Sequence, residues 1–263
     1  MKKPLRMKIL DLGEITCKRK ELIQTDSEEA MIISPMEAVL IEHPEAGYIL
    51  FDTGNSPDWA DTYPASVKEL YPISRFVSIE EALRKEGLTT NDISTVIVSH
   101  LHFDHAGGLR YFAGTKAGAN VLVSEAEWKD VNEKIPTAEN GTTGAYIGKL
   151  FYQISGIGFK PVSGEYKLAE GVTLFVQSCH TAGLVGMVVT LNDRKVLFTG
   201  DTVYLKDAYE KELPPGGAIN KTNEEFYRNL KVLKEMQQAL NAEIFYGHDY
   251  EQARSWRERG WIE

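Results

Sequence analysis

Four apolar segments of this chain each end in a side chain that can bind a metal ion. The segments are ILFDTG, TVIVSH, VLFTGD and EIFYGHD, and they carry Asp52, His100, Asp201 and His248. The run VTLFVQSCH ends in His180 in the same way. Short runs of apolar and β-branched residues predict strands. Strands that all finish in such polar groups predict a functional site along one edge of a sheet.

The densest of these strand ends is SHLHFDHAGG, which covers residues 99–108. It places three of the six histidines of the chain and one aspartate within six positions: His100, His102, Asp104 and His105. On a tight turn alternate residues can point the same way, so His100 and His102 can share one ion. Asp104 and His105 would then face a second position, and imidazole with carboxylate suits zinc, iron or manganese. The remaining ligands are expected at the later strand ends: His180, Asp201 and His248.

Nine short apolar runs predict strands: MKILDLG, MEAVLIE, YILFDTG, TVIVSH, NVLVSE, VTLFVQS, MVVTL, KVLFTGD and EIFYGHD. Turn-forming residues at 42–47 and 192–195 predict antiparallel hairpins. Hairpins mixed with helix signals along the whole length favour an α/β sandwich with sheet in the middle. No linker-like composition and no short repeat interrupts the chain, so we expect one domain over residues 1–263.

Three helix starts are marked by a serine or threonine three positions before a glutamate, the pattern of a capping box. The pairs are Ser78 with Glu81, Ser124 with Glu127, and Thr222 with Glu225. Gly87 is expected to end the first of these helices. In the last helix four apolar residues at helical spacing predict a stripe that faces the core: Phe226, Leu230, Leu233 and Leu240.

The composition excludes several kinds of partner. The net charge is −9, from 29 basic and 38 acidic residues, which argues against nucleic acid or an anionic membrane surface. The sequence has no run of about twenty apolar residues that could span a membrane. Its two cysteines, Cys17 and Cys179, fit a reducing cytosol, so we expect a cytoplasmic protein acting on a small molecule. The sequence does not indicate an oligomeric state.

The metal-binding motif also carries a family resemblance. HLHFDHAGG at 100–108, FDTG at 51–54, TGD at 199–201 and GHD at 247–249 resemble the signature of the metallo-β-lactamase superfamily. The resemblance implies a four-layer αββα fold and two divalent metal ions, with zinc expected and iron or manganese as alternatives. It implies that Asp52 orients a ligand histidine. It also implies ligands for one metal (His100, His102 and His180), for the other (Asp104, His105 and His248) and a bridge between them (Asp201).

Tyr204 narrows the expected reaction. Its position alone, three residues after Asp201, fits a core tyrosine and a tyrosine of the functional site equally well. Together with Phe103 and the ending GHDYEQ, however, it resembles the N-acyl homoserine lactone lactonases, which are quorum-quenching enzymes. That resemblance implies a metal-bridging hydroxide attacking a lactone carbonyl, with Tyr204 stabilising the charge and Asp104 passing a proton to the leaving alkoxide. Phe103 is expected in the acyl groove, and residues 136–164 are either a packed connection or a pocket wall.

At one position the sequence departs from the lactonase pattern, so the resemblance does not fix the substrate. The lactonases usually have a second histidine four residues after the third ligand, and this chain has Leu184 there. Cys179 could add a soft ligand, although a small buried residue explains it better.

The first alternative function is a thioesterase of the glyoxalase II kind, although the chain ends soon after GHD and lacks space for its glutathione-binding region. An alternative from another class is a mononuclear iron persulfide dioxygenase, which metal content and oxygen uptake would distinguish.

Overall fold

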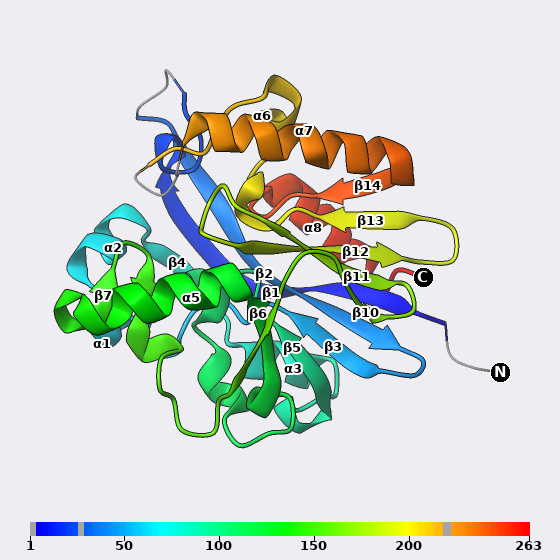
Figure 1. Cartoon of the computed structure of the whole chain (residues 1–263), viewed down its shortest axis with the longest axis horizontal. Coiled ribbons are helices and arrows are strands. Elements are labelled where there is room, and N and C mark those ends of the chain that lie inside the picture. The colour runs from blue at the N-terminus through cyan, green and yellow to red at the C-terminus, as the bar shows by residue number, and fades with distance from the viewer. Residues whose placement is uncertain (1–3, 26–28, 218–221) are drawn as a thin grey trace.

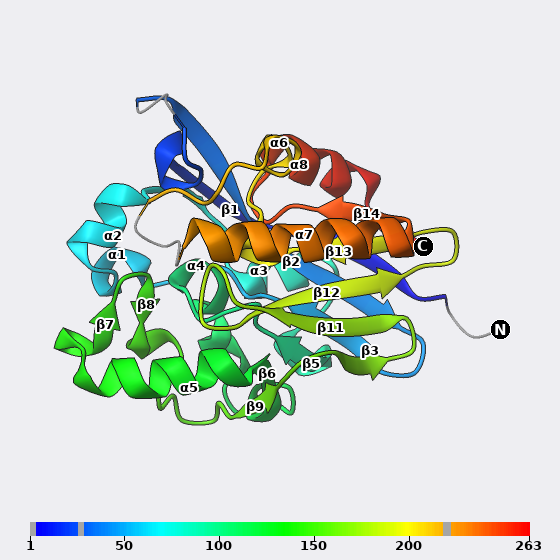
Figure 2. The ribbon, with the colours of Figure 1, turned by 45° about the horizontal axis from the view of Figure 1, so that its top comes forward.

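Two β-sheets packed face to face, with helices on their outer sides, form the body of the protein. The computed structural model describes residues 4–25, 29–217 and 222–263. Figures 1 and 2 show helices outside both sheets, for example α7 (Asn223–Leu240) lying across the sheet that contains β12 and β13. The layers follow the order α, β, β, α, which confirms the predicted four-layer sandwich.

The larger sheet has seven strands in the order β4-β1-β2-β3-β5-β6-β9. Their bounds are Arg6–Lys18 (β1), Met31–His43 (β2), Gly47–Phe51 (β3), Ile73–Phe76 (β4), Ile93–Ile97 (β5), Val121–Ser124 (β6) and Phe159–Val162 (β9). The strands β4, β1, β2 and β3 pair antiparallel, whereas β3, β5, β6 and β9 pair parallel. The hairpin predicted at 42–47 is confirmed by the pairing of His43 with Gly47.

The smaller sheet has five strands in the order β10-β11-β12-β13-β14. Their bounds are Tyr166–Ala169 (β10), Val172–Gln177 (β11), Leu184–Thr190 (β12), Lys195–Phe198 (β13) and Ala242–Phe245 (β14). The pairing of Thr190 with Lys195 confirms the second predicted hairpin, and β13 and β14 run parallel. Two further short strands, β7 (Thr142–Thr143) and β8 (Tyr146–Ile147), pair with each other.

The remaining elements are helices, and most are short. The α-helices before β14, besides α7, are α1 (Trp59–Thr62), α2 (Ala65–Leu70), α3 (Ile79–Lys85), α4 (Phe103–Ala106), α5 (Glu125–Lys134) and α6 (Lys206–Lys211); α8 (Tyr250–Arg259) follows it. Short 3-10 helices cover Arg19–Glu21, Thr90–Asp92, Leu109–Phe112, Gly118–Asn120, Ile135–Thr137, Glu139–Gly141, Gly148–Leu150 and Gly200–Thr202.

The local predictions hold at the helix starts, with one correction. The side chains of Ser78, Ser124 and Thr222 each accept a hydrogen bond from the backbone N–H of the glutamate three residues later. Gly87 follows α3 with a φ of 75°, as a helix-ending glycine should. A capping box would also have the glutamate side chain accept the backbone N–H of the N-cap residue, but the carboxyl of Glu127 turns into the interior and accepts hydrogen bonds from Leu101 and Tyr146.

The sheets bring the predicted metal-binding residues to one end of the sandwich. All nine predicted strands are present, and β3 runs parallel to β5 just as β13 runs parallel to β14. Because β11 and β13 each pair antiparallel with β12, β11 points the same way as β13. The carboxyl ends of parallel strands meet at one edge of a sheet, so the polar residues that follow these five strands gather there.

Candidate metal centre

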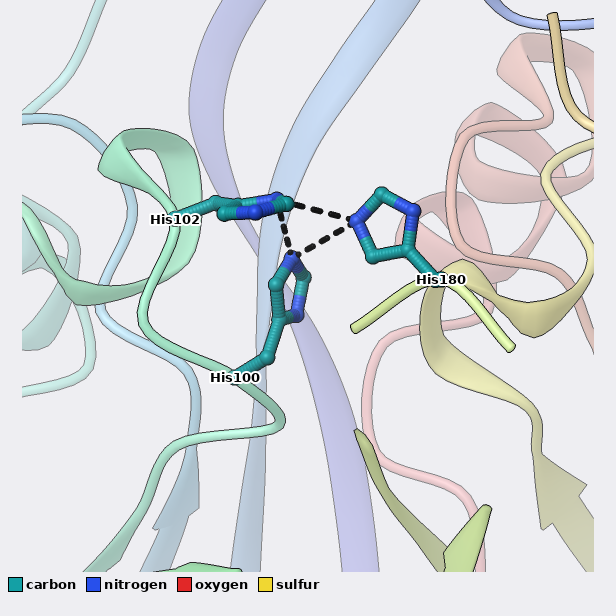
Figure 3. Close-up of side chains that lie close together, drawn as sticks. All are labelled: His100, His102 and His180. Atoms are coloured by element: carbon teal, nitrogen blue, oxygen red, sulfur yellow. Dashed lines mark hydrogen bonds between the residues drawn. The ribbon is translucent and has the colours of Figure 1, made fainter. Parts of the chain in front are cut away.

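Three histidines point their ring nitrogens at a common position, as Figure 3 shows. The Nε2 atom of His100 lies 3.0 Å from Nδ1 of His102 and 3.1 Å from Nε2 of His180, and the last two nitrogens are 2.9 Å apart. His100 and His102 come from the segment after β5, and His180 comes from the loop after β11. We call His100, His102 and His180 the three-histidine group.

Three other side chains form a second cluster beside the first. Nε2 of His105 lies 3.6 Å from Oδ2 of Asp104, and Nε2 of His248 lies 4.0 Å from the same oxygen. Asp104 and His105 lie on the short helix α4, where a turn after the strand was predicted, and His248 follows β14. We call Asp104, His105 and His248 the mixed group.

Asp201 lies between the two groups and faces both. Its Oδ2 atom is 3.7 Å from Nε2 of His100 and 3.4 Å from Nε2 of His180. Its Oδ1 atom is 3.3 Å from Nε2 of His105 and 3.2 Å from Nε2 of His248. One oxygen therefore faces each group, which is the arrangement that a bridging carboxylate needs.

The outer nitrogens of these rings have partners that leave the inner nitrogens free. Nδ1 of His105 donates to Oδ2 of Asp52 at 2.9 Å, and Nδ1 of His100 lies 3.0 Å from Oγ of Ser99. Nδ1 of His248 lies 2.9 Å from Oγ of Ser34. We assign the ring proton to Nδ1 in each of these three histidines, so that each Nε2 atom presents its lone pair to the site.

Asp52, which was expected to orient a ligand histidine, lies beneath the loop that carries His100, His102 and His105. Its backbone is left-handed, with a φ of 67°, which few residues other than glycine adopt. Its carboxylate accepts the backbone N–H of Ser99 at 2.6 Å and the Ser99 hydroxyl at 2.8 Å, besides the bond from His105. The strained backbone turns this carboxylate back under the metal-binding loop, where it fixes the start of the loop and one ring.

The electrostatics differ between the two groups. Burial and the neighbouring imidazoles hold the pKa values of His100 and His102 well below the usual range, and burial lowers the pKa of His180 to about 4. Burial opposes charge on His105 as well, but Asp201 and Asp104 outweigh it and raise its pKa well above the usual range. The three-histidine group is therefore neutral at pH 7, as nitrogen ligands must be. In the mixed group, the positive charge of His105 is balanced by the carboxylates of Asp201 and Asp104.

These residues fit divalent metal ions. Nε2 of His105 and Oδ1 of Asp201 are buried and have no hydrogen-bond partner among the described residues, although buried polar atoms nearly always have one. Nitrogens around a tetrahedral zinc ion with bonds of about 2.0–2.1 Å lie about 3.3 Å apart, close to the spacing in the three-histidine group. Buried polar atoms without a hydrogen-bond partner and converging ring nitrogens are both features that a metal site requires.

A cavity opens onto this cluster and holds the other predicted residues. Phe103 and Tyr204 line it, and so does Ala145 from the segment 136–164, whose neighbouring residues Tyr146 and Ile147 are packed in the core. The Tyr204 hydroxyl lies 3.0 Å from Nδ1 of His180. Leu184 is fully buried and packs against Gly200, and the buried Cys179 is not among the residues of the converging donor groups.

Four supporting residues were not predicted to belong to the site. Ser34 and Ser99 contact ligand histidines, Tyr146 packs its ring 4.5 Å from the ring of His102, and Glu127 bonds to the loop between two ligands. Ser99 could have been suspected because it precedes His100 directly. Ser34 and Tyr146 carry no local signal, since they are 214 and 44 residues from the histidines that they touch.

Comparison with known proteins agrees with this geometry. Residues 37–248 match the family model of the metallo-beta-lactamase superfamily. The chain belongs to the metallo-beta-lactamase superfamily. The matched part runs from β2 to His248 and so contains every residue of the three-histidine group, the mixed group and Asp201.

Within this superfamily the chain is similar to several lactonases. It is 30% identical over 230 residues to an N-acyl homoserine lactonase of a Bacillus species, covering 84% of this chain and 83% of the relative. It is 27% identical over 272 residues to the N-acyl homoserine lactonase AiiB of Agrobacterium fabrum, with 94% of each chain covered.

Solved structures of the superfamily show the same fold. One is a quorum-quenching N-acyl homoserine lactone lactonase, with 25% identity, a TM-score of 0.81 and complete coverage of both chains. Another is an AiiA variant of B. thuringiensis with N-decanoyl-L-homoserine bound at its active site. It has 24% identity, a TM-score of 0.83 and 98% coverage of both chains.

In the described part of this chain, none of the helices is long and apolar enough to cross a membrane.

Proposed function

We propose that this superfamily member is a metal-dependent hydrolase that opens the lactone ring of N-acyl homoserine lactones. The observation that carries the proposal is the position of Asp201, with one carboxylate oxygen toward each of two groups of metal-binding side chains. The relatives at 27–30% identity, which are N-acyl homoserine lactonases, support the choice of substrate. The proposed reaction is hydrolysis of a carboxylic ester, and its proposed role is quorum quenching.

We propose two zinc ions as the resident metals. The three-histidine group would hold one, the mixed group would hold the other, and Asp201 would bind both. The donor set of imidazoles and carboxylates suits zinc, and iron or manganese would also suit it. When bound, such ions lower the pKa of a water molecule to about 7 and polarise a carbonyl oxygen.

Tyr204 supplies a hydrogen bond to the substrate in this proposal. We assign the ring proton of His180 to Nδ1, because its Nε2 faces the metal position. Nδ1 then donates to the Tyr204 oxygen, and the hydroxyl proton of Tyr204 is left to donate into the cavity. Burial and the nearby Asp201 raise the pKa of Tyr204 well above the usual value, so the hydroxyl keeps its proton at neutral pH. A neutral donor of this kind stabilises negative charge that develops on the lactone carbonyl oxygen.

Asp104 moves the proton that the reaction requires. Hydrolysis consumes one water molecule, whose oxygen joins the carbonyl carbon while the bond from that carbon to the ring oxygen breaks. Burial, with Asp201 nearby, raises the pKa of Asp104, so its carboxyl holds a proton more readily than a surface aspartate. Asp104 takes the proton released by the attacking water and gives it to the ring oxygen, which leaves as the alcohol of an N-acyl homoserine.

The cavity walls provide an apolar place for the acyl chain. Phe103 packs against Tyr63 and Tyr71, with ring centroids 5.2 and 6.0 Å away, so its ring is held in one position. Ile15 and Leu22 line the same cavity from the β1 side. We propose that the acyl chain lies along Phe103, Ile15 and Leu22.

The cytoplasmic location and the single domain over residues 1–263 stay predictions.

The test is hydrolysis of a short-chain and a long-chain N-acyl homoserine lactone by the metal-loaded protein, followed as proton release at constant pH. Turnover of either substrate supports the proposal, and the ratio of the two rates measures the acyl preference. Absence of proton release with both metals bound would contradict it. Thioesters would then be tried as substrates, because a glyoxalase II-like activity uses the same kind of metal centre.

A further inference from the structure

The carboxyl of Glu127 lies where separate segments of the metal centre meet. Glu127 is on α5 and has no exposed surface. Its Oε1 atom accepts the backbone N–H of Leu101 at 3.0 Å, and its Oε2 atom accepts the hydroxyl of Tyr146 at 3.2 Å. Because Leu101 stands between His100 and His102, the first bond holds the loop that carries both of these histidines.

The second bond holds the wall on which His102 rests. The ring of Tyr146 meets the ring of His102 edge to face, with centroids 4.5 Å apart and an angle of 63° between the planes. The neighbouring carbonyl of Ala145 accepts the backbone N–H of Phe103 at 3.1 Å. The hydroxyl bond to Glu127 and this backbone bond together fix the position of the Tyr146 ring against the ligand.

The loop that carries His180 packs on the same part of α5. A Cβ atom at Gly183 would stand 2.1 Å from Oγ of Ser124 and 3.2 Å from the backbone nitrogen of Glu127, so only glycine allows this approach. Thr181 follows His180 directly, and its buried hydroxyl is close to Glu127 and Tyr146 without completing a hydrogen bond. Both segments that carry the three-histidine group, and the Tyr146 segment that packs on His102, therefore meet around Glu127.

Asp52 has the corresponding position on the other side of the centre. Its carboxylate bonds to Nδ1 of His105, a member of the mixed group, and to Ser99 at the start of the loop. The carboxyl of Glu127 instead accepts from Leu101 and Tyr146, and its backbone nitrogen lies against the loop that contains Gly183. The Ser99 hydroxyl also lies 3.0 Å from Nδ1 of His100, so Asp52 supports the mixed group directly and one ring of the three-histidine group through Ser99. The bonds of the Glu127 carboxyl lead to the loop and the wall around the three-histidine group.

We propose that Glu127 is a positioning residue for the metal held by the three-histidine group, while Asp52 positions the ligand His105 of the other metal. The inference rests on the metal centre proposed above. Groups that hold metal ligands in place through hydrogen bonds change metal affinity about 10- to 100-fold when they are removed. Loss of Glu127 is therefore expected to lower the occupancy of the three-histidine position and to leave the mixed position nearly unchanged, whereas loss of Asp52 is expected to affect the mixed position most.

The experiment measures zinc occupancy at each position separately. Crystals of the wild-type protein and of Glu127→Ala, Asp52→Asn and Glu125→Gln are equilibrated with a series of zinc concentrations buffered by a chelator. Anomalous scattering then gives the occupancy at each position. Glu125, exposed two residues earlier on α5, provides the matched control. No substrate is used, so failure of the proposed lactonase activity would not affect the result.

We expect Glu127→Ala to weaken zinc binding at the three-histidine group about 10- to 100-fold and at the mixed group by no more than about threefold. Asp52→Asn should weaken zinc binding most at the mixed group and by a smaller factor at the three-histidine group, through Ser99, and Glu125→Gln should match the wild type. Equal loss at both positions in Glu127→Ala, or no loss at either, would overturn the inference. If Glu127→Ala does not fold, Tyr146→Phe removes one of the two bonds and should weaken the same position by a smaller factor. An unselective effect of Tyr146→Phe would equally overturn the inference.

Discussion

The hydroxyl of Tyr204 lies 3.0 Å from Nδ1 of His180, so the tyrosine touches the outer nitrogen of a ring whose inner nitrogen faces the metal position. Because Nε2 of His180 is the nitrogen that faces the metal position, we assign the ring proton of His180 to Nδ1, and this assignment sets the direction of the hydroxyl. The imidazole N–H occupies a lone pair of the Tyr204 oxygen, and the hydroxyl hydrogen is free to point into the cavity. The same tyrosine can thus support a ligand and donate to a substrate.

Replacement of this hydroxyl should slow the reaction without emptying the site. We expect Tyr204→Phe to lower kcat about 10- to 100-fold, the lower part of the range for a lost oxyanion donor. Steady-state kinetics with metal analysis of the same sample would check this. Tyr209→Phe is the control, because its hydroxyl bonds to Gln237 away from the site. Unchanged kinetics in Tyr204→Phe would remove the tyrosine from the mechanism and leave the metal centre unaffected.

The shared carboxylate should be required for both metals. We expect Asp201→Ala to remove most activity and to lower the bound metal to about one ion per chain or less, since each oxygen of Asp201 faces one group. Elemental analysis after gel filtration would measure the metal content. Asp193→Ala, at an exposed turn, should keep the wild-type value. Two fully retained ions in Asp201→Ala would show that the carboxylate is no bridge.

A buried glutamate should make the protein less stable as the pH rises. Both carboxyl oxygens of Glu37 are buried without a hydrogen-bond partner among the described residues. Burial raises the pKa of Glu37 to about 8, with Arg257 opposing the shift and Asp11 and Asp249 adding to it. Between about pH 4.5 and pH 8 the folded protein thus holds a proton that the unfolded chain has lost. The free energy of unfolding therefore falls by up to about 1.4 kcal/mol per pH unit in this window.

Glu37→Gln tests this pH dependence, because an amide keeps the shape and does not ionise. The melting temperatures of the variant and the wild type should be close at pH 5, and the variant should melt at a higher temperature at pH 8. Glu69→Gln, at an exposed position, should show no such growing difference. Equal melting temperatures of Glu37→Gln and the wild type from pH 5 to pH 8 would contradict the prediction.

The narrow cavity should limit the length of the acyl chain. The cavity measures about 20 Å³ and Leu22 lines it, so a smaller side chain at this position would widen it. We expect Leu22→Ala to raise the ratio of kcat/KM for long-chain over short-chain lactones about three- to tenfold. Leu70→Ala, at an exposed position, serves as the control. A ratio that stays constant in Leu22→Ala would place the acyl chain elsewhere.

Much of the centre was predictable because metal chemistry selects residue types directly. The spacing of His100, His102, Asp104 and His105 and the polar ends of the strands needed no knowledge of long-range contacts. The strands themselves were predictable because their apolar runs are local and end at turn-forming residues. Even the N-cap of α5 followed from the local pattern of Ser124 with Glu127 three residues later, since a helix must satisfy its first N–H groups.

The roles of Glu127, Tyr146 and Ser34 were decided only by the tertiary structure. Locally, Glu127 has the pattern of a capping-box residue, but folding brings the N–H of Leu101 and the hydroxyl of Tyr146 to its carboxyl, and buried donors need acceptors. Ser34 meets His248 across 214 positions of sequence, through the packing of one sheet on the other. The residue types alone therefore determined which side chains could bind metal. The contacts between distant segments determined how those side chains are held, because a hydrogen bond depends on proximity in space and not on spacing along the chain.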